Sequence, residues 1–230
     1  METINLTDVD FPYEIVEGIN TLRTNVQFAG HDKKVILVTS CIQHEGKSTV
    51  SLELATSLAN LDKNVLLLDA DLRASTFINR VEGSKPSLGL SHLLSGQAKL
   101  SDVVYRTNRR GLYAIFAGPT PPKPTDLFSS QIFSNAVAEL RKVYDYIIID
   151  SAPLGAVVDA AIIAKNCDAS ILIVESGTSK YKFVQKVKDD LETTGCPIIG
   201  AVLTKVKINK HSPYYSRYYG YGYGKENNLE

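Results

Sequence analysis

One segment near the start of the chain fixes the order of a strand, a loop and a helix. Residues 35–38 (VILV) are a short apolar run that predicts a buried strand. A loop follows and ends in Gly46-Lys47-Ser48-Thr49, after which apolar residues recur at helical spacing. In this order, backbone N–H groups of the loop and of the first helical turn point at an anion, which the lysine neutralises. The segment therefore predicts a phosphate-binding loop.

The match to the P-loop pattern is incomplete, because Cys41 stands where the pattern has its first glycine. If the loop binds a nucleotide, Lys47 neutralises the β- and γ-phosphates and the Ser48 hydroxyl holds Mg²⁺. The alternative is an ordinary turn from a strand to a capped helix, so other segments must decide. The expected nucleotide contacts are the end of the loop and the start of the helix: Gln43, His44, Glu45, Gly46, Lys47, Ser48 and Thr49.

Two further apolar runs end in carboxylates. Residues 65–68 (VLLL) lead into Asp69 and Asp71, and residues 147–149 (III) lead into Asp150. Open α/β sheets bind ligands at the carboxyl ends of their strands, and burying a carboxylate without a cation is costly. Solvated aspartates on a surface turn are the alternative for the first pair, but the length of the preceding apolar run argues against it. The carboxylate after the third run has the Walker B position, which places Mg²⁺.

Strand and helix patterns alternate along the 230 residues, which predicts one doubly wound α/β domain with a mostly parallel sheet. The 25 basic and 25 acidic residues cancel, so bulk charge supplies no case for nucleic acid as a partner. Three cysteines without C-x-x-C spacing fit a reducing compartment. No apolar stretch approaches the ~20 residues of a membrane span, and the N-terminus lacks a signal-peptide pattern, so we expect a cytoplasmic protein.

The remaining elements are predicted from periodicity. Helices are expected at 14–28, 47–60, 89–94, 100–105, 128–143, 156–165 and 179–194, and strands at 34–39, 65–68, 112–117, 147–149, 170–175 and 198–204. In the helix at 128–143, Ile132, Val137, Leu140 and Val143 are the expected core positions.

The last residues of the chain have a composition of their own. Interleaved glycines and charges leave no amphipathic period from residue 211 onward, which predicts a disordered tail. A generic low-complexity segment and a base-stacking segment are both compatible with the pattern, but the second needs a more basic background. The tail holds half of the chain's twelve tyrosines: Tyr214, Tyr215, Tyr218, Tyr219, Tyr221 and Tyr223.

Taken together, IQHEGKST, LLLDADLR and IIIDSAP resemble the Walker A, A′ and B motifs of the bacterial tyrosine kinases. The A′ form, three apolar residues followed by D-x-D-x-R, distinguishes that family, and the tyrosine-rich C-terminus is also similar. The resemblance covers residues 14–224. It is strongest to the cytoplasmic form of Gram-positive bacteria, which acts in capsule and exopolysaccharide synthesis and is encoded apart from its membrane-spanning activator.

The resemblance implies an ATP- and Mg²⁺-dependent protein tyrosine autokinase, a P-loop NTPase by fold. It implies that Lys47, Asp69 and Asp71 are catalytic, with Asp69 as the base for the tyrosine hydroxyl, and that Ser48, Asp71 and Asp150 hold Mg²⁺. The six tail tyrosines are the implied autophosphorylation sites. The implied partners are a polysaccharide co-polymerase activator, which recruits the kinase to the inner face of the membrane, and a tyrosine phosphatase.

The family also builds rings through an E-x-x-R-x-x-R helix that docks on a neighbour. Glu17 and Arg23 match that motif, whereas Asn20 replaces its middle arginine; by residues alone, this edge of the helix is a solvated one. We expect a homo-oligomer on the strength of the resemblance. The expected division is an N-terminal oligomerisation segment (1–30), a P-loop kinase domain (31–210) and a disordered tyrosine-rich tail (211–230).

The rival function is a nucleotide-switched ATPase of the ParA/MinD type without kinase activity. Such proteins carry a signature lysine early in the P-loop, where this chain has Ile42, and they lack the tyrosine tail. A nucleotide-binding regulator without catalysis is a third option, against which the full set of Lys47 and three aspartates counts. Two loop residues are open: His44 faces either solvent or the phosphates, and Cys41, near a helix N-terminus and Lys47, is expected to have a lowered thiol pKa.

Overall fold

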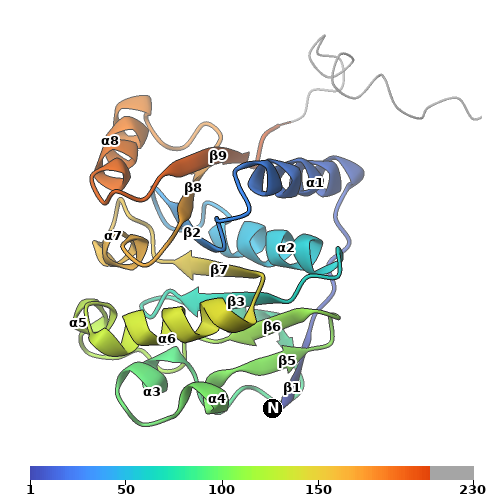
Figure 1. The fold of residues 1–230 in the computed structure, drawn as a ribbon. Helices are drawn as coiled ribbons and strands as arrows, with labels where there is room; N and C mark the ends of the chain where they lie inside the picture. The colour runs from blue at the N-terminus through green and yellow to red at the C-terminus, as the bar shows by residue number, and fades with distance from the viewer. Residues whose placement is uncertain (208–230) are drawn as a thin grey trace, which may run out of the picture.

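The computed structural model describes residues 1–207 and shows a central sheet between two layers of helices (Figure 1). The strand order is β4-β1-β5-β6-β3-β7-β2-β8-β9. The β4–β1 and β5–β6 pairs are antiparallel and the other pairs are parallel. The predicted doubly wound, mostly parallel α/β fold is therefore confirmed. The predicted tail with its six tyrosines lies outside the described residues.

The bounds of the elements agree with most of the predicted ranges. The strands are β1 (Thr3–Leu6), β2 (Val35–Ser40), β3 (Val65–Ala70), β4 (Val81–Glu82), β5 (Tyr105–Thr107), β6 (Leu112–Ile115), β7 (Tyr146–Ser151), β8 (Ala169–Glu175) and β9 (Ile198–Thr204). The helices are α1 (Tyr13–Phe28), α2 (Lys47–Ala59), the 3₁₀ turn η1 (Phe77–Arg80), α3 (Leu90–Leu94), α4 (Leu100–Val103), α5 (Pro124–Phe128), α6 (Gln131–Val143), α7 (Asp159–Ala164) and α8 (Tyr181–Glu192).

The central strands are buried on both faces. In β2, Val35 and Leu37 belong to one hydrophobic cluster, whereas Ile36 and Val38 belong to another. Successive side chains of a strand point to opposite faces, so the two clusters are the two faces of the sheet. Residues of α1 and α2 cover one face, and residues of α3, α4, α6 and α7 cover the other. Burial on both faces is the reason that these strands read as continuous apolar runs.

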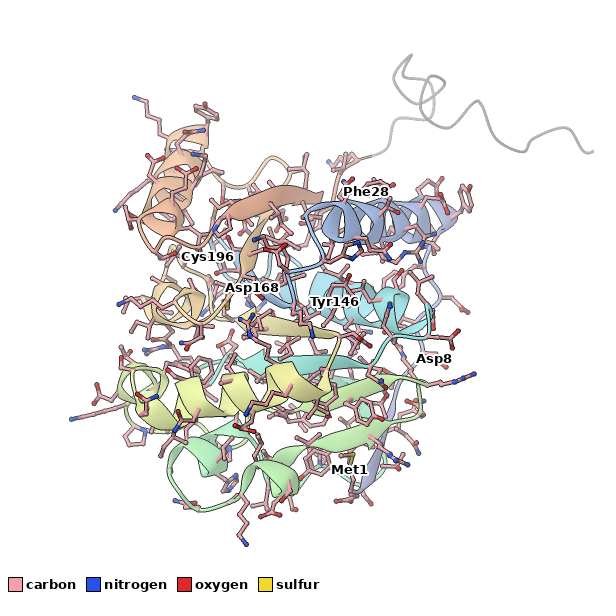
Figure 2. The ribbon with its side chains drawn as sticks, viewed as in Figure 1. Met1, Asp8, Phe28, Tyr146, Asp168 and Cys196 are labelled. Carbon is pink, nitrogen blue, oxygen red and sulfur yellow. The ribbon has the colours of Figure 1, made fainter. Side chains whose placement is uncertain are left out.

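The start of β2 is held by a half-buried ion pair. Asp168, labelled in Figure 2, accepts hydrogen bonds from the backbone N–H groups of Lys34 and Val35 at 2.9 and 2.8 Å. Arg141 of α6 donates to the same carboxylate, with 2.8 Å between its Nη1 and Asp168 Oδ1. These contacts anchor the entry of the strand whose other end becomes the phosphate-binding loop.

Several sequence predictions differ from the structure, and β4, β5, η1 and α5 were not predicted. The first strand, β1, was not predicted; it is only four residues long, and its buried Ile4 and Leu6 alternate with exposed residues. The helix predicted at 100–105 ends at Val103, because the chain turns to form β5. The helix predicted at 128–143 begins only at Gln131, as α6, because Phe128 ends the separate helix α5; two of its expected core residues are exposed, Ile132 at 42% and Val143 at 68%.

The described residues include no helix that combines the length and the apolarity needed to cross a membrane.

Candidate active site

The carboxyl ends of β2, β3 and β7, which carry the three predicted motifs, lie side by side. In the sheet, β7 is between β3 and β2, and Asp69 of β3 is in register with Asp150 of β7. Val38, near the end of β2, is opposite Asp150 on the other side. Because all three strands are parallel, their carboxyl ends bring the phosphate-binding loop and the aspartates to one edge of the sheet.

Lys47, the first residue of α2, points into this edge. Its Nζ lies 3.7 Å from Asp71 Oδ2 and 3.8 Å from Asp150 Oδ1, and all three side chains are about nine-tenths buried or more. Two buried carboxylates without a counter-charge would be costly, so the ammonium stabilises them. The structure thus brings together residues from three separate segments of the sequence.

Asp69 is the most deeply placed of the three aspartates. The pKa of its carboxyl is raised to about 7, chiefly by burial and next by the neighbouring Asp150 carboxylate, against the lowering effect of two hydrogen-bond donors. Those donors are the Ser75 hydroxyl, on Oδ2, and the Asp71 backbone N–H, on Oδ1 at 3.2 Å. A carboxyl with a pKa near neutrality both gains and releases a proton readily, which suits general acid–base chemistry.

The oxygen donors at this edge fit a magnesium ion. Burial raises the pKa of Asp150, while Lys47 and a hydrogen bond from the Ser48 hydroxyl lower it. Ser48, Asp71 and Asp150 offer only oxygen atoms, which Mg²⁺ prefers. Over residues 1–207, no three His, Cys, Asp or Glu side chains are grouped to hold an ion by themselves. A nucleotide-bound Mg²⁺ would need only a few side chains of the protein, because Mg²⁺ usually keeps waters and substrate phosphates among its ligands.

A cavity of about 220 Å³ opens beside these groups. It is lined by the loop and the helix start, with Asp71 and residues from the segments after β3 and β7 on the other side: Gln43, His44, Gly46, Lys47, Ser48, Thr49, Asp71, Ala74, Thr76 and Pro153. Six of the seven predicted nucleotide contacts therefore line one cavity.

Glu45 is the seventh predicted contact, and the structure places it differently. Its side chain is fully buried and turned away from the cavity. One carboxylate oxygen accepts the backbone N–H groups of Cys41 and Ile42 at 2.7 and 3.0 Å. The other accepts the Glu175 N–H and the Ser179 hydroxyl, both at 3.1 Å. The first amides of the loop thus point at a carboxylate of the chain itself.

The last strand also holds the loop. Thr204 at the end of β9 donates to the Glu45 carbonyl at 2.7 Å, and Lys205 Nζ donates to the His44 carbonyl at 2.8 Å. His44 itself has φ 64°, a left-handed conformation that non-glycine residues rarely adopt. Its side chain is exposed and lines the cavity, so both predicted alternatives for His44, solvent and phosphate, remain compatible with its position.

The comparisons with known proteins agree with this geometry. The family model described as an AAA domain matches residues 33–189. The tyrosine-protein kinase CpsD of Streptococcus agalactiae is 40% identical over 206 residues, which cover 90% of this chain and 89% of CpsD. The chain belongs to the bacterial tyrosine kinase family.

Solved structures with this fold include a tyrosine kinase domain and a septum site-determining protein. The kinase domain of Escherichia coli tyrosine kinase ETK superimposes with a TM-score of 0.80 and 28% identity over 97% of this chain and 94% of its own. The septum site-determining protein MinD of Pyrococcus horikoshii, complexed with Mg-ADP, gives a TM-score of 0.63 and 26% identity over 74% and 69%. The fold is shared with both, and the fuller match is to the kinase domain.

The thiol prediction for this kinase is wrong. Cys41 is fully buried beneath the loop, and burial, together with the nearby Glu45 carboxylate, raises the pKa of its thiol to about 11. The carbonyl of Cys41 is also covered by Gly155, where any side chain would collide with it. The helix N-terminus and Lys47 therefore do not govern this thiol, because desolvation outweighs them.

The helix motif predicted for oligomerisation is engaged within the chain. Arg23 Nη1 donates to Ser57 Oγ of α2 at 3.0 Å, and Asn20 donates to Glu17 Oε1 at 3.0 Å. The role of Glu17 and Arg23 in a ring remains a prediction.

An ion pair beside the site was not predicted from the sequence. Arg73 forms a two-point ion pair with Asp159, at 2.6 and 3.0 Å, and Thr125 donates to the same carboxylate at 2.8 Å. This pair ties the segment after β3 to α5 and α7. The aspartate lies 86 residues from its partner, so no local sequence pattern links the two and the folded chain reveals the pair.

Replacing Glu45 with glutamine is expected to weaken ATP binding by about tenfold or more. An amide offers one acceptor oxygen and an NH₂ group that faces N–H donors, so at least two hydrogen bonds to a charged group are lost, each worth roughly 1.5–3 kcal/mol. Titration calorimetry with a non-hydrolysable ATP analogue measures the change. Glu139→Gln, at an exposed site of α6, is the matched control. Unchanged affinity in Glu45→Gln would show that the loop is held by other contacts.

Proposed function

We propose that this protein is an ATP-dependent kinase that phosphorylates the tyrosines of its own C-terminal segment. The observation that carries the proposal is the buried group of Lys47, Asp69, Asp71 and Asp150 at the edge of the P-loop cavity. The family to which the chain belongs supports tyrosine as the acceptor. The proposed sites are Tyr214, Tyr215, Tyr218, Tyr219, Tyr221 and Tyr223.

The chemical step is an in-line phosphoryl transfer. The phenol oxygen of the acceptor forms a bond to the γ-phosphorus of ATP, the bond from that phosphorus to the β–γ bridging oxygen breaks, and ADP leaves. The phenol proton passes to the Asp69 carboxylate. Lys47 holds the β- and γ-phosphates and neutralises charge that develops on them. Because a phenol has a pKa of about 10, its proton is lost late, and most of the rate comes from positioning.

ATP and Mg²⁺ are the proposed cofactors. Ser48, Asp71 and Asp150 would hold the ion, which supplies charge neutralisation between the phosphates when bound. Oxygen donors from the helix start and from two strand ends support this assignment, as does the P-loop fold itself.

The proposed biological setting is capsule or exopolysaccharide synthesis. By resemblance to the cytoplasmic kinases of Gram-positive bacteria, the chain would work with a separate membrane-spanning activator that recruits it to the inner face of the membrane. A ring of copies and a tyrosine phosphatase that reverses the reaction complete this proposal. The nucleotide-switched ATPase is less well supported, because the overlap with MinD covers a smaller part of the chain than the overlap with the kinase domain of ETK.

Changing all six tail tyrosines to phenylalanine is expected to remove the autophosphorylation signal and leave ATP binding intact. Phenylalanine keeps the ring and deletes the accepting hydroxyl. The measurement is phosphotyrosine formed from labelled ATP, with the activator's cytoplasmic segment present. Tyr13→Phe with Tyr181→Phe, at sites that are 64% and 75% exposed, is the control and should retain the signal. Full labelling of the six-fold variant would contradict the proposed acceptors.

A further inference from the structure

Two residues at the end of β9 hold the outer side of the phosphate-binding loop. The Thr204 hydroxyl donates to the Glu45 carbonyl at 2.7 Å, and Lys205 Nζ donates to the His44 carbonyl at 2.8 Å. We call Thr204 and Lys205 together the β9 clamp. His44 and Gly46 line the phosphate-binding cavity, whereas neither clamp residue does. The clamp therefore bonds the loop from outside the cavity.

The two clamped carbonyls fix two consecutive peptide planes. The C=O and the N–H of a trans peptide lie in one plane and point in opposite directions. The His44 carbonyl shares its plane with the Glu45 N–H, and the Glu45 carbonyl shares its plane with the Gly46 N–H. Because both carbonyls point at the clamp, both N–H groups point away from it, toward the cavity side of the loop. Within residues 1–207, neither N–H group has a hydrogen-bond acceptor.

Consecutive N–H groups that face one side of a loop form a concave site for an anion. Leaving them without acceptors is unfavourable in the free protein, and a phosphate group supplies the acceptors that are missing. The donors thus have to be held in place before the ligand arrives. The loop lacks the first glycine of the P-loop pattern, and His44 has φ 64°, which a side chain disfavours. Contacts from outside the loop must therefore maintain this conformation.

Lys205 is itself fixed between two acceptors. Besides the His44 carbonyl, its Nζ donates to Glu175 Oε2 at 2.8 Å, and this hydrogen bond lowers the pKa of the Glu175 carboxyl. Glu175 is in register with Thr204 across the β8–β9 pair, and its N–H donates to the Glu45 carboxylate at 3.1 Å. The loop, the clamp and the end of β8 therefore form a closed circuit of contacts, in which strand pairing fixes the position of the ammonium.

We propose that Lys205 is a positioning residue of this kinase, which holds the His44 carbonyl outside the cavity and so aims the N–H groups of Glu45 and Gly46 at the phosphates of the nucleotide. The inference rests on the proposed function in that ATP is the ligand. Lys47 neutralises the phosphates from inside the cavity, whereas Lys205 acts through the backbone. Without the clamp the two peptide planes are free to turn, and ordering them again opposes binding.

Three substitutions test the clamp in the full chain. Lys205→Met deletes the ammonium and keeps much of the stem, and Thr204→Val deletes the hydroxyl from a side chain of nearly the same shape. Lys205→Arg keeps a charged donor and is the rescue variant. Lysine, methionine and arginine all carry a side chain at φ 51°, so the comparison isolates the donor from the backbone. The main readout is the affinity for a non-hydrolysable ATP analogue with Mg²⁺, measured by titration calorimetry.

Each deletion has a matched control on α8. Lys188→Met breaks an ion pair with Glu192, and the Lys188 side chain is 42% exposed against 51% for Lys205. Thr193→Val removes a hydroxyl that donates to the Asp190 carbonyl at 2.7 Å, the same length as the bond from Thr204 to the loop. Neither contact touches the phosphate-binding loop.

Lys205→Met and Thr204→Val are expected to weaken binding of the analogue at least fivefold, while Lys205→Arg and both controls stay within twofold of the unsubstituted protein. The KM of ATP should rise by the same factor, and the KM of an acceptor peptide of residues 214–223 should stay within twofold. Unchanged affinity in Lys205→Met, or an equal loss in Lys205→Arg, would overturn the inference. If the affinities change as expected but the unsubstituted protein forms no phosphotyrosine, the proposed function fails and the role of Lys205 in nucleotide binding stands.

A spectroscopic signature separates the aim of the N–H groups from general stability. In isotope-labelled protein, the Gly46 amide proton resonance is expected to move downfield when Mg-ADP saturates the site, because its N–H then donates to a phosphate oxygen. In Lys205→Met at saturation, the same resonance is expected to move by less than half as much, and in Lys188→Met by the full amount. Equal shifts in Lys205→Met and the unsubstituted protein would show that the clamp does not set the direction of this N–H group.

Discussion

Lys47→Met is expected to reduce tyrosine phosphorylation by about 10²–10³-fold or more, the loss typical of removing one preorganised donor to developing charge. Lys47 is the only side chain with Nζ within 4 Å of both Asp71 and Asp150 among the described residues. Methionine keeps much of the length and apolar volume of the lysine stem and deletes the ammonium. The measurement is the initial rate of phosphotyrosine formation from labelled ATP.

The same change is expected to leave the protein folded. In the native chain, the ammonium lowers the pKa of Asp150 against a larger effect of burial. Without it, burial drives Asp150 to its neutral form, which removes the charge that would otherwise be left unpaired. Circular dichroism and gel filtration should therefore be unchanged. Lys63→Met, at an exposed turn, is the control for loss of a lysine. Retention of more than a tenth of the activity in Lys47→Met would contradict the role of Lys47.

The strand ends were predictable from sequence for a physical reason. A parallel strand that is buried on both faces must be apolar along its length, so a carboxylate that ends such a run stands out. Asp69, Asp71 and Asp150 were marked in this way, and topology alone then brings them to one edge of the sheet. The helical spacing after Lys47 likewise placed the start of α2.

Other parts of the site depend on contacts that no local pattern encodes. Glu45 was predicted to face the nucleotide, but its carboxylate instead binds backbone groups of the loop and of β8, which lies 130 residues away. Cys41 was predicted from its neighbours in sequence, whereas its burial under Gly155 depends on the loop after β7. Strand β1 is too short to show a periodic pattern of apolar residues. The break between α5 and α6 at Ser129 is also too short to interrupt such a pattern visibly.

Asp69→Asn is expected to abolish most activity and at the same time to stabilise the free protein at neutral and alkaline pH. Loss of a general base typically costs about 10²–10⁴-fold in rate. The amide can replace the carboxyl in place, since its oxygen accepts the Asp71 N–H and its NH₂ group donates to Ser75, whose hydroxyl can also accept. The substitution removes the unfavourable free energy of a buried negative charge beside Asp150.

The pH dependence of that gain has a definite sign. The pKa of Asp69 is about 7 in the folded protein and near 3.8 in the unfolded chain. Between these values the folded state holds a proton that the unfolded state has lost, so the stability of the native protein falls as pH rises from about 4 to about 7. About three pKa units correspond to ~4 kcal/mol, an upper estimate because Asp150 titrates in the same cluster.

Urea unfolding of both proteins in EDTA at pH 4.5, 6 and 8 measures this difference. The free energy of unfolding of Asp69→Asn minus that of the native protein is expected to be small at pH 4.5 and to grow by several kcal/mol up to pH 8. Asp145→Asn, outside the cluster and next to β7, is the control and should show no such growth. A difference that is flat in pH would mean that Asp69 is ionised at every pH tested, with Lys47 rather than a proton balancing its charge. If the native protein is less stable than Asp69→Asn but is the only active form of the two, Asp69 is a catalytic group that the protein retains at a cost in folding stability.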